Sequence, residues 1–172
     1  MRSLGMVIAG ACIGLVAARS PILAEESDAK AQAELASALK TAKVSLEKGL
    51  AASEREGKPI SAKFEVEDGK LQLSVYTAKN NKFSEVVVDH QTGKIAKTEA
   101  ITGGEDLTAA KEQSEAMAKA KSSLVAATKR ALEGNKGSHV VSVIPALKNG
   151  RPIAEVTLLK GEELKKISQD LD

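Results

Sequence analysis

The sequence predicts an α+β protein made of two tandem repeats, each a long helix packed on a three-stranded antiparallel sheet. The chain resembles itself at an offset of 81 residues, the separation of Val44 from Val125. Each copy begins with an apolar period of about 3.6 and continues with a period of about 2, which is typical of an amphipathic helix followed by half-buried strands. The identities at this offset pair Val44 with Val125, Ser61 with Ser142, Gly69 with Gly150, Val75 with Val156, Lys79 with Lys160 and Asp89 with Asp170.

The N-terminal segment, residues 1–24, has the features of a secretory signal peptide. Arg2 gives it a positive start, an apolar run covers residues 4–18, and the small Ala24 ends it. Because the run is shorter than the roughly 20 apolar residues of a spanning helix, we expect cleavage after Ala24 rather than a membrane anchor. The mature protein would be periplasmic or secreted, without membrane insertion, and would lack the only cysteine, Cys12.

The charge balance of the mature chain argues against two classes of partner. Cleavage would remove Arg2 and Arg19 from the 25 basic residues and leave 23, which equals the number of acidic residues. The sequence contains neither a basic stripe interleaved with aromatics nor a polybasic block. We therefore expect no nucleic-acid partner and no binding to lipid headgroups.

The first repeat, residues 25–101, opens with an amphipathic helix expected over 28–55, which Gly57 and Pro59 bring to an end. A strand with alternating apolar side chains follows at 60–66. Phe64 is the largest side chain on its apolar face. The predicted core of this repeat consists of Leu39, Leu46, Leu50, Phe64, Leu73, Val75 and Val86.

Turn residues divide the sheet of the first repeat into three strands. Asp68 and Gly69 form a two-residue hairpin turn that requires positive φ angles. Alternation resumes at 71–75, and a polar turn at 79–82 precedes a third strand over 83–89. The repeat is therefore expected to fold as one helix and one antiparallel meander.

The second repeat, residues 102–172, follows the same order and is truncated after its third strand. Thr102 and Glu105 suggest a capping box for a helix that reaches Gly134, and the Asn149-Gly150 pair suggests the hairpin turn. Pro145 lacks a backbone donor, so its strand should lie at an edge or carry a bulge. The spacing of apolar residues in 164–171 also suits a short helix, but correspondence with 83–89 favours a strand.

The third strand of the first repeat and the turn after it carry a resemblance to a known family. The segment Val86-Val87-Val88-Asp89-His90-Gln91-Thr92-Gly93-Lys94-Ile95 resembles the PepSY domain, whose units end in an apolar strand followed by Asp-x-x-Thr-Gly-Lys or a near variant. The second copy resembles the same unit in its helix, hairpin and final Leu-x-x-Ile, but it lacks the Thr-Gly turn. The similarity covers roughly residues 35–172.

The resemblance implies an exported or membrane-associated module without catalytic residues. Such domains occur in metallopeptidase propeptides and as free-standing secreted proteins, and they have been proposed to restrain peptidases. The turn residues Asp89, Thr92, Gly93 and Lys94 have a structural explanation, because Asp and Thr side chains cap tight turns and Gly93 supplies the unusual backbone conformation. We prefer that explanation to a binding role.

The residue inventory argues against an enzyme. The two histidines, His90 and His139, lie outside any nucleophile motif, and no zinc motif or phosphate loop is present. We therefore predict no catalytic, cofactor-binding or metal-ligating residues.

Three non-enzymatic hypotheses remain. The first is a peptide or peptidase-binding module that accepts an extended segment at an exposed strand edge formed by Lys63, Phe64, Glu65 and Tyr76. The second is a structural or interaction protein of the cell envelope whose helices make the contacts. The third is a weak cation binder that uses Asp89, His90 and neighbouring acidic residues.

Overall fold

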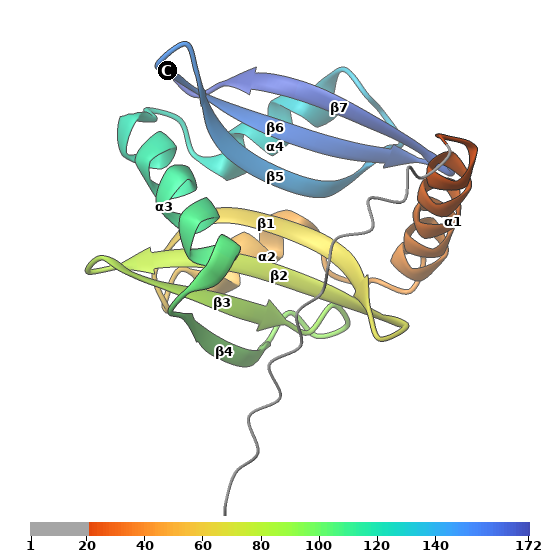
Figure 1. Cartoon of the computed structure of the whole chain (residues 1–172), viewed down its shortest axis with the longest axis horizontal. Coiled ribbons are helices and arrows are strands. Elements are labelled where there is room, and N and C mark those ends of the chain that lie inside the picture. The colour runs from red at the N-terminus through yellow and green to blue at the C-terminus, as the bar shows by residue number, and fades with distance from the viewer. Residues whose placement is uncertain (1–20) are drawn as a thin grey trace, which may run out of the picture.

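The structure is a computed structural model in which residues 21–172 are described. Residues 1–20, which hold most of the predicted signal peptide, lie outside the described residues, so the structure does not bear on cleavage. The described chain forms four helices and seven strands (Figure 1). In chain order these are α1 (Pro21–Leu39), α2 (Leu46–Ser53), β1 (Lys58–Glu67), β2 (Lys70–Lys79), β3 (Lys82–Val88), β4 (Ile95–Ile101), α3 (Gly104–Lys119), α4 (Leu124–Glu133), β5 (His139–Lys148), β6 (Arg151–Lys160) and β7 (Glu163–Asp170).

All seven strands belong to one antiparallel sheet in the order β4-β3-β2-β1-β5-β6-β7. The predicted α+β class is confirmed, but the prediction of two tandem repeats, each a single helix on its own three-stranded sheet, is wrong. The halves join edge to edge through β1 and β5, where Ala62 pairs with Val143 and Lys63 with Ser142. β4 was not predicted; it pairs with β3 and extends the sheet on one side only.

The strands of the two halves nevertheless repeat each other closely. Ala62 and its partner Val143 are themselves 81 residues apart, so β1 and β5 meet around equivalent positions. The register of the first hairpin shifts just before Ser61, and that of the second shifts just before Ser142, which is the equivalent residue. The similarity of the sequence to itself therefore corresponds to an approximate twofold relation at the centre of the sheet.

The single long helix predicted for each repeat is wrong, because each is broken into two. In the first half, the amides of Lys43 and Val44 donate to the carbonyl of His90 at 2.9 and 3.1 Å, and Ser45 then caps α2. In the second half, the amides of Lys121 and Ser122 donate to Leu171, which is equivalent to His90, at 2.7 and 2.9 Å. In each half, the helix is interrupted where these amides bond to a carbonyl just after the third strand of that half, at His90 after β3 and at Leu171 after β7.

The helices cover both faces of the sheet. α2 packs on the face that carries Leu73, since a Cβ atom at Gly49 would lie 2.6 Å from that side chain. α3 lies on the opposite face, where Ser61 Oγ donates to Gln113 Oε1 at 2.7 Å. Figure 1 shows α3 in front of the sheet, across the β1–β5 junction, with α2 and α4 behind it.

The predicted core is largely confirmed. Leu46, Leu50, Phe64, Leu73, Val75 and Val86 are buried, while Leu39 is only partly buried against them. Both predicted hairpin turns have the expected positive φ angles, 49° and 71° at Asp68 and Gly69 and 53° and 78° at Asn149 and Gly150. The strand preferred for 164–171 is confirmed as β7.

Of two local predictions for the second half, one is wrong and one is confirmed. The capping box is wrong, because Gly103 occupies the N-cap of α3 and makes no side-chain cap bond. The strand that holds Pro145 is not an edge strand, but it carries the bulge that was predicted as the alternative, a register shift just before Ser142. Pro145 is tolerated because it lies beyond the two residues through which β5 pairs with β1.

Candidate functional site

We predicted that Lys63, Phe64, Glu65 and Tyr76 form an exposed strand edge. This prediction is wrong, because none of them lies in an edge strand. β1 lies in the centre of the sheet, with β2 on one side and β5 on the other. Phe64 also points away from the other three residues: it pairs with Leu73 on the α2 face and is buried there. Lys63, Glu65 and Tyr76 instead share the face on which α3 lies.

Those three side chains form a compact polar cluster. Lys63 Nζ lies 2.6 Å from Glu65 Oε2 and 5.7 Å from the centre of the Tyr76 ring. Burial alone would lower the pKa of Lys63, but its hydrogen bond with Glu65 and its interaction with Tyr76 raise the pKa above the ordinary value. For Tyr76 burial acts in the other direction: it raises the pKa, and the nearby charge of Lys63 opposes that shift. Lys63 therefore stays charged at neutral pH.

Hydrogen bonds extend the cluster across β2 toward β3. Ser74 Oγ donates to Glu65 Oε1 at 3.1 Å, and Gln72 Nε2 donates to Ser74 Oγ at 2.9 Å and to Glu85 Oε1 at 3.4 Å. A continuous polar surface therefore covers this face of β1, β2 and β3, in contrast to the apolar face beneath α2.

Two adjoining cavities lie between α3 and this face of the sheet. One, of about 160 Å³, is lined by Lys63 and Tyr76 together with Asp106 and Gln113 of α3. The other, of about 330 Å³, extends along β5. Ile144 lines both and is 39% exposed. We call this surface the α3 groove.

Sequence reasoning missed the α3 groove because it depends on where α3 crosses the sheet. One signal was present: Ile144 follows the inward-facing Val143 at a position where alternation calls for a polar residue. In the folded protein α3 lies beside that residue, and the two together line the groove.

The turn after β3 has the structural role that the sequence suggested. Asp89 Oδ1 accepts hydrogen bonds from the amides of Gln91 and Thr92, both at 2.8 Å. Thr92 Oγ1 accepts from the amide of Lys94 at 3.4 Å, and Gly93 has a φ of 74°. Because the carbonyl of His90 holds the link between α1 and α2, the turn fixes the break between these helices.

The stability of the protein is expected to fall at acid pH partly because of this turn. The amides of Thr92 and Gln91 lower the pKa of Asp89 below its ordinary value. A lowered folded-state pKa stabilises the protein at pH values above the unfolded-state pKa of about 3.9, and this contribution is lost as the pH falls through the folded-state value.

Urea unfolding of the wild type and Asp89→Asn from pH 7 to pH 2 measures this effect. The variant should be less stable at pH 7, and the difference should shrink at low pH. A difference that is the same at every pH would contradict the role of the carboxylate.

The ends of the sheet differ in how open their backbones are. At β7, the backbone carbonyl of Asp170 already accepts a hydrogen bond from Arg130 Nη2 at 2.7 Å. The side chain of Lys165 also donates a hydrogen bond to Asn135 Oδ1 at 2.9 Å, so the segment after α4 lies beside this strand. No side chain of residues 29–172 forms a hydrogen bond with the backbone of β4. The central residues of β4, 96–100, are exposed on both faces. β4 therefore presents the more open edge.

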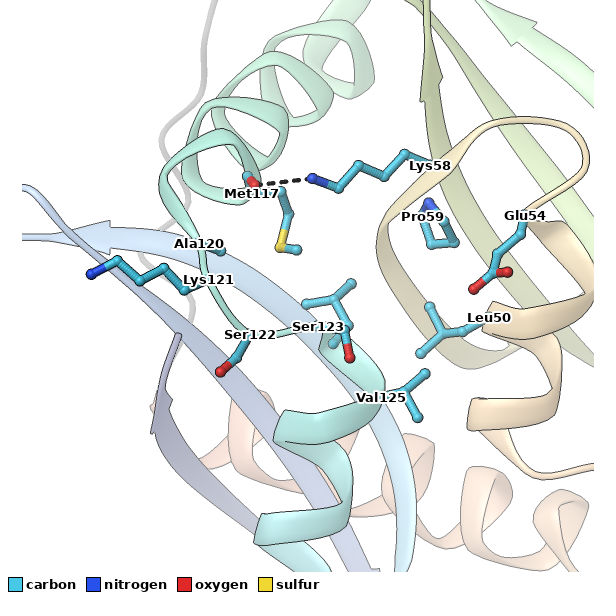
Figure 2. Close-up of a pocket in the computed structure, with 11 residues that line it drawn as sticks. Leu50, Glu54, Lys58, Pro59, Met117, Ala120, Lys121, Ser122, Ser123 and Val125 are labelled. Atoms are coloured by element: carbon cyan, nitrogen blue, oxygen red, sulfur yellow. Dashed lines mark hydrogen bonds between the residues drawn. The ribbon is translucent and has the colours of Figure 1, made fainter. Parts of the chain in front are cut away.

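A cleft of about 310 Å³ lies where α2, the α3–α4 link and the start of β1 meet (Figure 2). Figure 2 shows Lys58 reaching across it, with Nζ donating to the carbonyl of Met117 at 3.2 Å. Lys58 thus satisfies a carbonyl at the end of α3, as basic side chains commonly do at helix C-termini. An equivalent cleft of about 280 Å³ lies where the α1–α2 link and the start of β5 meet, with His139 at the position equivalent to Lys58.

Neither histidine takes part in a recognisable catalytic arrangement within residues 21–172. His90 Nδ1 lies 3.2 Å from Gln91 Nε2, and the hydrogen bonds of the described residues join neither histidine to a serine or threonine hydroxyl. The same residues contain no group of three or more His, Cys, Asp or Glu side chains placed to hold a metal ion.

Comparison with known proteins gives little further guidance. No family model matches the chain, and neither does any curated protein. Among solved structures, the chain is similar to the crystal structure of a putative lipoprotein from Clostridium difficile 630, with a TM-score of 0.42 and 12% identity over 70% of this chain and 79% of that one. So weak a likeness leaves the function to be argued from the residues. No helix within residues 21–172 is long and apolar enough to cross a membrane.

Proposed function

We propose that the protein is an exported, non-catalytic binding module of the PepSY type that accepts extended peptide segments, including a segment of a peptidase that it restrains. The observation that carries the proposal is the open backbone of β4. An edge strand presents unpaired N–H and C=O groups, and an extended peptide can pair with them as an additional strand.

The side chains of β4 leave room for such a partner. On one face, Lys97 Nζ and Glu99 Oε1 form an ion pair at 2.8 Å, so their charges are balanced. On the other face lie Ala96, Thr98 and Ala100, all exposed. A strand added beside β4 would meet only small side chains on that face.

Main-chain pairing predicts affinity with little sequence selectivity. We expect a capped, uncharged peptide of high β propensity to bind, and the same peptide with alternate amides N-methylated to lose binding. Isothermal titration calorimetry compares the two directly. Equal binding of both peptides would contradict strand addition.

Proline variants locate the site on β4. Lys97→Pro and Thr98→Pro affect adjacent residues, and only one of the two backbone N–H groups can point away from β3. The variant that removes the outward N–H should fold and lose peptide binding, while Thr98→Val should bind as the wild type does. Circular dichroism identifies the folded variant. Full binding by that variant would exclude β4 as the site.

A further inference from the structure

The α3 groove has an apolar floor, called the seat below, and acidic side chains along its border, called the rim. The seat is Ile144, the one large hydrophobic side chain exposed among the described residues whose burial is known, with Ala109 of α3 above it. The rim consists of Asp106, Glu112 and Glu115, all exposed on α3. The larger cavity, which Ile144 lines, is mostly apolar with a few polar groups at its border, as binding sites commonly are.

The charges of this rim are only partly balanced from within the protein. Lys119 Nζ lies 3.2 Å from Glu115, but Asp106 and Glu112 form no ion pair within residues 21–172. Glu155 adds a further carboxylate on the sheet side, since it is exposed and pairs with Ile144 across the β5–β6 hairpin.

The only basic residue that lines either cavity is Lys63, and its charge is balanced by Glu65 at 2.6 Å. The excess of charge around Ile144 is therefore negative. A partner with positive charge beside an apolar group would match it.

We infer that the α3 groove binds a segment of a partner protein in which an aliphatic side chain is flanked by lysine or arginine. The aliphatic side chain would lie on Ile144, and the flanking cations would face Asp106 and Glu112. This inference rests on the proposed peptide-binding function and adds a second site, which recognises side chains rather than the main chain.

The geometry supports a short segment rather than a broad interface. The cavities, about 160 and 330 Å³, adjoin along one side of α3, and the larger has the size of a small ligand pocket. A positive segment would also be drawn toward the acidic rim from a distance. That attraction should weaken as salt rises, because the Debye length falls from about 30 Å at 0.01 M to about 10 Å at 0.1 M.

Binding of two labelled peptides to the full protein tests the inference. One carries a leucine flanked by lysines, and the other carries the same leucine flanked by glutamates. Fluorescence anisotropy should show binding of the lysine peptide only, with affinity that decreases as salt rises. In amide NMR spectra, the shifts should concentrate at Ala109, Gln113 and Ile144. Equal binding of the two peptides, or shifts confined to β4, would overturn the inference.

Variants of the groove separate its apolar and acidic parts. Ile144→Thr keeps a β-branched side chain and should weaken binding of the lysine peptide by about tenfold. Asp106→Asn combined with Glu112→Gln should have a similar effect at low salt and a smaller one at high salt. The matched controls, Val87→Thr on β3 and Glu163→Gln on β7, lie outside the groove and should bind as the wild type does.

The β4 variants distinguish this site from the proposed one. The folded proline variant of β4 should still bind the lysine peptide. If groove variants bind normally and the β4 variant does not, the groove is excluded while strand addition stands. If the lysine peptide fails to bind any form of the protein, the inference is overturned, whatever the result with the uncharged peptide.

Discussion

Replacing Phe64 with alanine is expected to lower the free energy of unfolding by about 3 to 5 kcal/mol, the usual cost of truncating a buried phenylalanine. Phe64 is only 4% exposed and belongs to the core between the sheet and its helices. It pairs with the fully buried Leu73 across the first hairpin. The neighbouring strands cannot collapse onto the cavity without losing their register, so most of the lost contact area stays unfilled.

Denaturant unfolding monitored by circular dichroism measures this cost. Ile144→Ala is the control, because Ile144 is a strand residue of comparable hydrophobicity but 39% exposed, and it should change stability by about 1 kcal/mol or less. If Phe64→Ala costs no more than the control, β1 is shifted by one residue, since such a slip would turn Phe64 to the other face.

The hairpin turns of this fold could be predicted from the sequence because each depends on only a few neighbouring residues. Asp68-Gly69 and Asn149-Gly150 specify their turns locally, because positive φ angles favour these residue types. The assignment of β7 came from the repeat: the spacing of its apolar residues also suits a helix, whereas the equivalent strand β3 is unambiguous.

The breaks in the helices could not be predicted because their cause is distant in sequence. The apolar stripe continues through residues 40–45, and nothing local forbids a helix there. The break occurs because amides of Lys43 and Val44 bind the carbonyl of His90, which β3 and its turn position. Ser45 and Ser123 cap the helices that follow, but serine alone is too common to mark a helix start.

The candidate sites were missed for a related reason. The alternation of the sequence correctly places Lys63 and Glu65 at outward positions of β1. The edge predicted to include them, together with Phe64 and Tyr76, is wrong because the sequence does not show that β1 pairs with β5. That pairing involves only two residue pairs, around Ala62 and Val143. The α3 groove likewise exists only because α3 crosses the junction of the halves (Figure 1).

Proline at Lys63 is expected to abolish cooperative folding, and this is the sharpest test of the central position of β1. Lys63 pairs with Ser74 of β2 and with Ser142 of β5. Whichever side its N–H faces, the proline removes a donor from a paired strand, and proline is found in sheets almost only at edges, at strand starts or at bulges. If the lost bond is one with β5, it removes a large part of the short junction of the halves; if it is one with β2, it breaks the first hairpin near its centre.

The same substitution has a different outcome if β1 is an edge. In that case one of two adjacent positions tolerates proline, as expected for Lys97 and Thr98 in β4. We therefore expect Lys63→Pro to give no cooperative thermal transition and the protein with proline at the outward position of β4 to retain one. Lys63→Ala controls for the loss of the side chain and should fold, because the ion pair with Glu65 is partly exposed and contributes about 1 kcal/mol at most. A cooperative transition in Lys63→Pro near that of the wild type would mean that the two halves are not joined through β1 and β5.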